Sequence, residues 1–138
     1  MRYDDRMTVP IGPHTVELEG DIVIVRLKGE FTLAHMKEWC ALTDQLLKTQ
    51  GHVFTISDFR GGGYFPADAR RYASEWSNTT KVWGSAIFGA GTTARVIISM
   101  MARVTALLKK HTIPTVAVES EEAARAWIDA RRQQLLKE

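Results

Sequence analysis

The feature that most constrains the fold is a short run of β-branched residues, Ile22-Val-Ile-Val-Arg-Leu27, which is almost entirely apolar. Such a run is typical of a central strand with both faces covered, because a half-exposed strand alternates polar and apolar residues. The preceding segment, residues 15–20, does alternate in this way. The turn signal Gly20-Asp21 lies between the two segments, and together they predict a β-hairpin.

After the hairpin, helical and strand patterns alternate along the chain. Thr32 is placed to cap a helix that runs to about Gln50, with Met36 and Cys40 on its apolar face. We expect further strands at residues 52–56, 82–88 and 113–118, and further helices from Pro66 to about residue 76, from 92 to 111, and from Ser120 onward. The order β-β-α-β-α-β-α-β-α predicts an α/β fold, with a mixed, mostly parallel sheet of about five strands covered by about four helices.

Length, charge and composition narrow the class of protein. The 138 residues suit one domain, which we place at residues 14–138, after a loose lead-in at residues 1–13 that holds two of the four prolines. A net charge of +2 is too small to predict nucleic-acid binding. The single cysteine excludes an internal disulfide. The sequence has no apolar run long enough to span a bilayer, and its first residues lack the apolar core of a signal peptide. We therefore expect a cytoplasmic protein.

Three stretches, together with the element order, resemble the STAS fold of sulfate-transporter tails and anti-sigma-factor antagonists, and most closely its SpoIIAA-like branch. They are the hairpin 16–29 followed by Glu30-Phe-Thr and a helix, the strand ending in Ser57-Asp58-Phe-Arg60-Gly61 before a helix with Ala69-Arg70-Arg71, and the closing Glu121-Glu-Ala-Arg-Ala-Trp127-Ile. The resemblance spans residues 14–130. It implies a regulatory binding module with a protein partner, without a cofactor and without catalysis.

In the anti-sigma-factor antagonists, a partner kinase phosphorylates a serine within an Asp-Ser-Ser-Gly-type motif, and this motif falls near Asp58. The present chain has Asp58-Phe59-Arg60-Gly61 there, with no serine or threonine between Asp58 and Ala73. The phosphorylation site is therefore not carried over. SpoIIAA-like proteins are also compared with lipid-binding SEC14 domains, which implies an apolar ligand or a membrane surface as an alternative.

The first candidate binding stretch follows the strand that ends near Ser57. It consists of Asp58, Arg60, Gly61, Gly62, Gly63, Tyr64 and Phe65. Glycines let the backbone approach a ligand closely, arginine offers a fork of donors, and the aromatic residues supply surface. A loop at the carboxyl end of a strand is where ligands bind in open α/β sheets. The alternative is a flexible turn in which Asp58 forms a salt bridge with a neighbouring arginine.

The second candidate stretch is Gly89-Ala-Gly-Thr-Thr-Ala94, which fits the loose dinucleotide pattern G-x-G-x-x-A. Its expected anion-binding residues are Gly89, Gly91, Thr92, Thr93 and Arg95. A small nucleotide-binding protein is one alternative, although too little chain follows for the second half of a dinucleotide fold. The other alternative is a tight strand-to-helix turn that needs small residues.

The helix expected at residues 92–111 is apolar with a basic edge, which suits a protein partner, a second copy in a homodimer, a membrane surface or a buried position. The four histidines are far apart in the sequence, and with one cysteine they predict no metal site. No catalytic motif is present. We therefore expect a non-catalytic module that binds a protein partner or a small apolar or anionic ligand at the two glycine-bearing stretches.

Overall fold

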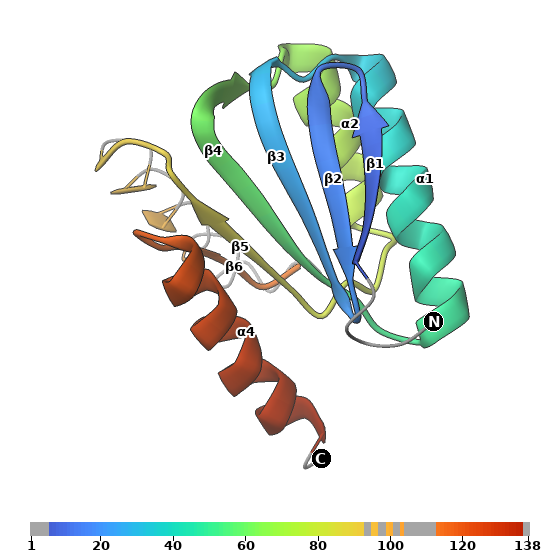
Figure 1. The fold of residues 1–138 in the computed structure, drawn as a ribbon, viewed down its shortest axis with the longest axis vertical. Helices are drawn as coiled ribbons and strands as arrows, with labels where there is room; N and C mark the ends of the chain where they lie inside the picture. The colour runs from blue at the N-terminus through green and yellow to red at the C-terminus, as the bar shows by residue number, and fades with distance from the viewer. Residues whose placement is uncertain (1–5, 93–94, 97–98, 101–102, 104–112, 137–138) are drawn as a thin grey trace.

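The computed structural model describes residues 6–92, 95–96, 99–100, 103 and 113–136. Within these ranges the chain forms one sheet in the order β1-β2-β3-β4-β5-β6, flanked by helices (Figure 1). The strands are β1 (Arg6–Ile11), β2 (His14–Glu19), β3 (Ile22–Glu30), β4 (Phe54–Tyr64), β5 (Gly84–Phe88) and β6 (Thr115–Ala117). The helices with defined bounds are α1 (Leu33–Gln50), α2 (Ala67–Ser77) and α4 (Glu121–Leu136).

The sheet is mixed. Strands β1, β2 and β3 pair antiparallel, whereas β3, β4, β5 and β6 pair parallel. Helices α1 and α2 each connect two neighbouring parallel strands, as crossover connections do. The predicted α/β fold with a mixed, mostly parallel sheet is therefore confirmed. Of the helix expected at 92–111, the described residues 92, 95, 96, 99, 100 and 103 are helical, and the others lie outside the described residues.

Strand β1 lies in the segment that we expected to be a loose lead-in, and for residues 6–11 that expectation is wrong. Its Pro10 had argued against a strand. In the described sheet β1 is an outer strand paired with β2, and an edge strand tolerates proline because one of its sides needs no ladder hydrogen bonds. Ile11 is buried, and Val9 packs beside it against α1.

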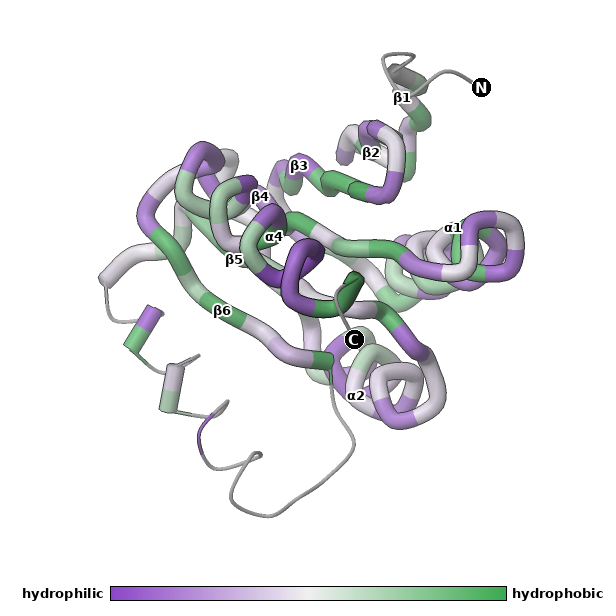
Figure 2. Tube along the Cα trace, turned by 90° about the horizontal axis from the view of Figure 1, so that it is seen from below, coloured by the Kyte–Doolittle hydropathy of each residue, from purple (hydrophilic) through white to green (hydrophobic). Residues whose placement is uncertain are grey.

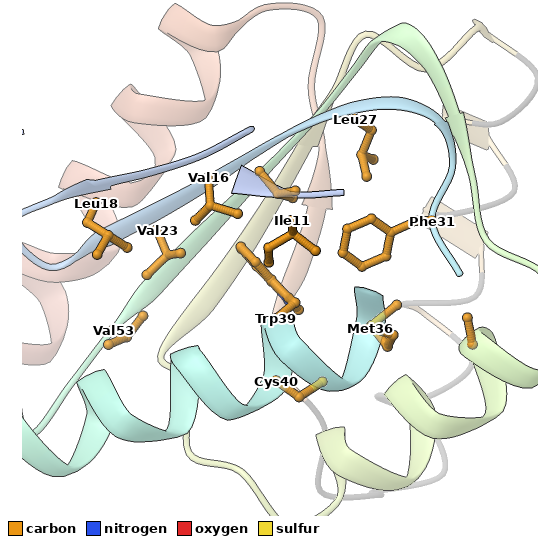
Figure 3. Close-up of a cluster of buried hydrophobic side chains, with 12 residues drawn as sticks. Ile11, Val16, Leu18, Val23, Leu27, Phe31, Met36, Trp39, Cys40 and Val53 are labelled. Atoms are coloured by element: carbon orange, nitrogen blue, oxygen red, sulfur yellow. The ribbon is translucent and has the colours of Figure 1, made fainter. Parts of the chain in front are cut away.

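Two apolar clusters, one on each face of the sheet, form the core of the described structure. On one face β1, β2 and β3 pack against α1 and α2 (Figure 3), and on the other β3, β4 and β5 pack against α4. The run 22–27 explains this division, because Ile22 and Ile24 belong to the α4 side while Val23 and Val25 belong to the α1 side. Both faces of β3 are covered, as its sequence predicts.

The hydropathy of the chain follows these layers. Figure 2 shows hydrophobic residues along the strands, whereas α1 and α4 alternate hydrophobic and hydrophilic residues. Such alternation is expected of helices that cover a sheet with one side and face water with the other. Among the described helices none is long and apolar enough to cross a membrane.

Helix α1 begins and ends where the sequence predicts. The hydroxyl of Thr32 accepts a hydrogen bond from the backbone N–H of His35 (3.2 Å), and the His35 Nδ1 atom accepts one from the backbone N–H of Thr32 (3.1 Å). This reciprocal cap satisfies two amide groups at the start of the helix. Gly51 follows the last turn with a φ of 87°, a left-handed conformation that glycine adopts without a side-chain clash.

Strand β4 is longer than expected and includes the glycine run that we interpreted as a loop. At two successive steps β4 contributes three residues where β3 contributes two, which marks two irregularities of the bulge type. The paired residues are, in order, Arg26 with Asp58, Lys28 with Gly61, and Glu30 with Tyr64. The expectation of a flexible turn is therefore wrong for residues 58–64, since they pair with β3.

Close packing explains two of the three glycines in this run. A Cβ atom on Gly61 would lie 2.3 Å from the carbonyl oxygen of Leu27, and one on Gly63 would lie 2.4 Å from the Leu27 Cβ atom. Gly62 has a φ of 83° and no described atom near its missing Cβ. The glycines therefore let a bulged strand approach β3, which is a packing requirement and not evidence of a ligand.

We predict that Gly61→Ala destabilises the fold by about 1–3 kcal/mol, because the new methyl group collides with backbone that cannot rotate away. Chemical denaturation followed by circular dichroism measures the change. The matched control is Gly91→Ala, at a position where a Cβ atom meets nothing within 4 Å and φ is not left-handed. Equal stability of the two variants would contradict the role assigned to Gly61.

Candidate functional site

Asp58 lies midway along β4, next to the carboxyl end of β5. Its pairing partners are Arg26 on β3 and Phe88 on β5, so Asp58 lies in the middle of three neighbouring parallel strands. The Asp58 side chain is only 6% exposed. A carboxylate that is buried to this extent must be paired and hydrogen-bonded.

Two arginines satisfy the Asp58 carboxylate. Arg60 donates from Nε to Oδ1 (3.0 Å) and from Nη2 to Oδ2 (2.8 Å), and its backbone N–H also donates to Oδ1 (3.0 Å). Arg26 donates from Nη1 to Oδ2 (3.0 Å). The two oxygens thus accept four hydrogen bonds, which is about the full capacity of a carboxylate. The expectation that Asp58 forms a salt bridge with a neighbouring arginine is correct.

The ion pairs extend from Asp58 to the start of α4. Arg26 also donates to Glu17 (2.5 Å) and to Glu121 (2.8 Å), so its guanidinium joins β2, β3, β4 and α4. Arg125, one turn after Glu121, bonds to Glu121 (3.1 Å) and to Glu19 on β2 (2.5 Å). Helix α4 is therefore tied by its first turns to the hairpin.

The network keeps its acids ionised. Burial pushes the pKa of Asp58 upward, but hydrogen bonds from Arg60 and Arg26 outweigh burial, so that the pKa lies below its ordinary value of 3.8. The hydrogen bond from Arg26 likewise lowers the pKa of Glu121. A paired carboxylate with a lowered pKa is a poor proton acceptor, so Asp58 has the properties of a structural ion and not of a general base.

The two glycine-bearing stretches lie side by side in the described structure. Gly89 has a φ of 81°, and a Cβ atom there would lie 2.7 Å from both the backbone nitrogen and the Cγ atom of Arg60. The Arg60 guanidinium lies 5.0 Å from the centre of the Phe88 ring. Arg60 thus occupies the place that a side chain at residue 89 would need, and glycine is required there by packing.

We use the name strand-end surface for residues 58–65 together with the described residues of 89–95. Gly91 and Thr92 are exposed and Arg95 is half-buried, whereas Thr93 lies outside the described residues. The structure thus joins the two predicted stretches through the contact of Gly89 with Arg60. It does not test whether they bind a ligand, so their binding role stays a prediction.

The two aromatic residues of this surface have different environments. Tyr64 is 56% exposed, whereas Phe65 is partly buried and packs at 5.6 Å from the rings of Phe31 and Phe59. Tyr64 can therefore contact a partner directly. Phe65 offers less of its ring to solvent than Tyr64 does, because it anchors the connection between β4 and α2 to the core.

Four residues that hold this surface together were not predicted from the sequence, namely Arg26, Glu17, Glu121 and Arg125. One signal was present, since Arg26 is the only charged residue in the apolar run 22–27 and a charge there must find partners. The identity of those partners depends on the fold. Glu121 lies 95 residues away in the sequence.

Two histidines that are distant in the sequence are neighbours in space. The rings of His14 and His35 lie 4.9 Å apart, next to Phe31. Both His14 nitrogens bond to backbone, with Nδ1 accepting from the N–H of Lys28 (2.9 Å) and Nε2 lying 2.9 Å from the carbonyl oxygen of Glu30. The described residues contain no group of three that could hold a metal ion.

Comparisons with known proteins give two further findings. A family model described as SpoIIAA-like matches residues 22–129, which is more than half of the chain. The structure of the anti-sigma factor antagonist SpoIIAA in its unphosphorylated form superimposes with a TM-score of 0.47 and 14% sequence identity, covering 93% of this chain and 98% of that one. Comparison with curated proteins finds no match.

We predict that Asp58→Asn lowers the free energy of unfolding by about 1.5–3 kcal/mol, the value of a hydrogen-bonded charge, because the amide can no longer neutralise two arginines. The matched control is Asp68→Asn on the exposed start of α2, which should cost only a few tenths of a kcal/mol. Denaturant melts of the three proteins measure both changes. A stable Asp58→Asn protein would show that the network does not depend on this carboxylate.

We predict that the protein loses stability as the pH falls below about 6.5. Burial lowers the pKa of His14 below its ordinary value of 6.5, although the bond to Glu30 opposes this effect. The unfolded chain therefore takes up a proton at a higher pH than the folded chain, and this contribution is present above pH 6.5 and lost below it. Melting temperatures from pH 8 to 5 should fall less steeply for His14→Gln, and parallel slopes would rule His14 out.

Proposed function

The chain belongs to the SpoIIAA-like family, and on this premise we propose that it is a non-catalytic regulatory module that binds a protein partner at the strand-end surface. The proposal concerns the class of partner and the surface. It includes neither a phosphorylation site nor a cofactor.

The observation that carries the proposal is the rigid position of Arg60 between the two glycine-bearing stretches. Asp58 holds the guanidinium through two parallel hydrogen bonds, the Phe88 ring lies beneath it, and Gly89 closes over its stem. The side chain nevertheless remains 63% exposed. A fixed and exposed arginine suits recognition, because little conformational entropy is lost when it binds.

Tyr64 completes a pattern that is common in protein interfaces. Tyrosine and arginine are over-represented among the residues that contribute most to binding, since each combines a large contact area with a polar group. Tyr64 ends β4 and is more than half exposed, while Phe65 beside it is anchored in the core. The backbone that carries the exposed Tyr64 ring is therefore held in place by the packing of Phe65.

The electrostatics of the surface favour binding over catalysis. Acid–base catalysis needs a group whose pKa lies near the working pH. Asp58 at this surface and Glu121 in the ion-pair network beneath it instead have lowered pKa values and are held by arginines. These groups can position a partner, but they are poorly suited to move a proton.

A lipid surface is a second candidate, supported by one observation. Val96 and Met100 are 52% and 59% exposed and lie one helical turn apart. Arg95 and Arg103 line the same hollow as these two residues, so that apolar and basic side chains lie together, as in helices that bind a membrane surface. For the nucleotide alternative we find less support, because contact with Arg60 already explains Gly89.

We predict that Tyr64→Ala weakens binding of the protein partner by about 30-fold or more, the effect of losing an interface residue worth about 2 kcal/mol. The partner is first identified by cross-linking in an extract of the source cells, and its affinity for each purified variant is then measured by calorimetry. Lys48→Ala, on the last turn of α1, is the matched control and should bind as the unmodified protein does. Equal affinity of Tyr64→Ala and the control would remove the strand-end surface from consideration.

A further inference from the structure

Next to Arg60 the surface is hollowed on the side that faces α4. The hollow has a volume of about 500 Å³ and is open to solvent. Its charged lining comes from two neighbouring strands, with Arg26 and Lys28 on β3 and Asp58 and Arg60 on β4. Because side chains two residues apart on a strand share a face, these four residues form two adjacent rows.

The inner row is neutralised within the protein. Arg26 bonds directly to Asp58, and its remaining donors go to Glu17 and Glu121, neither of which lines the hollow. Asp58 accepts four hydrogen bonds and has no capacity left for another donor. The inner row therefore holds the outer row in place, and few of its donors and acceptors remain free to bind a ligand.

The outer row differs, because its two cations keep donors that no described residue uses. The Lys28 side chain is exposed, and none of the described residues accepts a hydrogen bond from its ammonium group. Arg60 uses Nε and Nη2 on Asp58, while its Nη1 atom donates to none of the residues that the structure describes. Thr15, across the hollow on β2, adds a hydroxyl group.

Gly61 lies next to both cations. It is the residue paired with Lys28, and it follows Arg60 directly. Gly61 also lines the hollow, so that the hollow reaches the backbone of β4 beside Lys28. Two like charges on neighbouring strands repel each other, and an anion between them would relieve that repulsion.

We propose that this hollow is a binding site for an anionic group, a carboxylate or phosphoryl group, held between Lys28 and Arg60. Asp58 is the positioning residue, because it orients the guanidinium without touching the ligand. Charge-assisted bonds from a guanidinium and an ammonium group are the recognition that proteins use for such groups. The inference rests on the proposed function, since it names the chemistry of the partner or ligand that the strand-end surface accepts.

The test uses two probes against the full chain, namely inorganic phosphate and an oligoglutamate peptide, each compared with chloride at equal ionic strength. Binding is followed by the backbone amide NMR signals of residues 26–28 and 58–62. We expect the signals to shift saturably as the probe is added. The affinity obtained from these shifts should fall at least about tenfold in Lys28→Gln, because the variant loses one charged hydrogen bond. Lys28 is exposed, so this variant should fold.

Arg60→Gln should lose the same shifts, and Lys48→Gln, far along α1, should keep them. A response to phosphate alone assigns a small anion or a phosphoryl group, and a response to the peptide alone assigns carboxylates of a protein. No saturable response to either probe, or an equal response in Lys28→Gln, overturns the proposal.

Tyr64→Ala separates this inference from the proposed function. It should bind phosphate as the unmodified protein does while losing the protein partner, because Tyr64 does not line the hollow. If the partner still depends on Tyr64 but neither probe binds, the anion site is wrong and the partner surface stands. If a probe binds but the partner ignores Tyr64, the anion site stands alone.

Discussion

The described structure depends on one constraint, namely that the carboxylate of Asp58 is buried between parallel strands and must be neutralised there. Arg26 and Arg60 meet this requirement from two neighbouring positions, and each then has a second consequence. Arg26 reaches Glu121 and fixes the start of α4, while Arg60 fills the space under Gly89. A single buried charge thereby joins the sheet, the last helix and the turn after β5.

The same arrangement links the fold to the proposed binding. Exposed ion pairs on a protein surface contribute little to stability, because water screens them and the side chains lose entropy. Here the acid is buried and one of the cations remains exposed, so that the protein interior fixes the orientation of a group that faces solvent. Such a surface is pre-organised, so that little conformational entropy is lost when a partner binds.

Much of the fold could be predicted because it follows from local patterns. The apolar first half of β3, the cap at Thr32 and the end of α1 at Gly51 are all encoded within a few residues. Strand β1 was missed because Pro10 is a local argument against a strand, and only its edge position makes it acceptable. The bulged end of β4 was missed because glycines read as a loop unless the neighbouring Leu27 is known. The partners of Arg26 could not be predicted, since residues that are distant in the sequence become neighbours only through the topology of the sheet.

Helix α4 also bears on how the chain reaches its folded state. Its ties to the hairpin, from Glu121 to Arg26, from Arg125 to Glu19 and from Arg132 to Asp21, span 95, 106 and 111 residues of sequence. Contacts of such long range form late, because the entropy lost on closing a long loop precedes the free energy gained from the contacts. During synthesis the hairpin, α1 and β4 leave the ribosome well before α4 does, with one apolar face of the sheet still uncovered. Until α4 emerges, that apolar face is exposed to solvent, and exposed apolar surface of this kind favours aggregation.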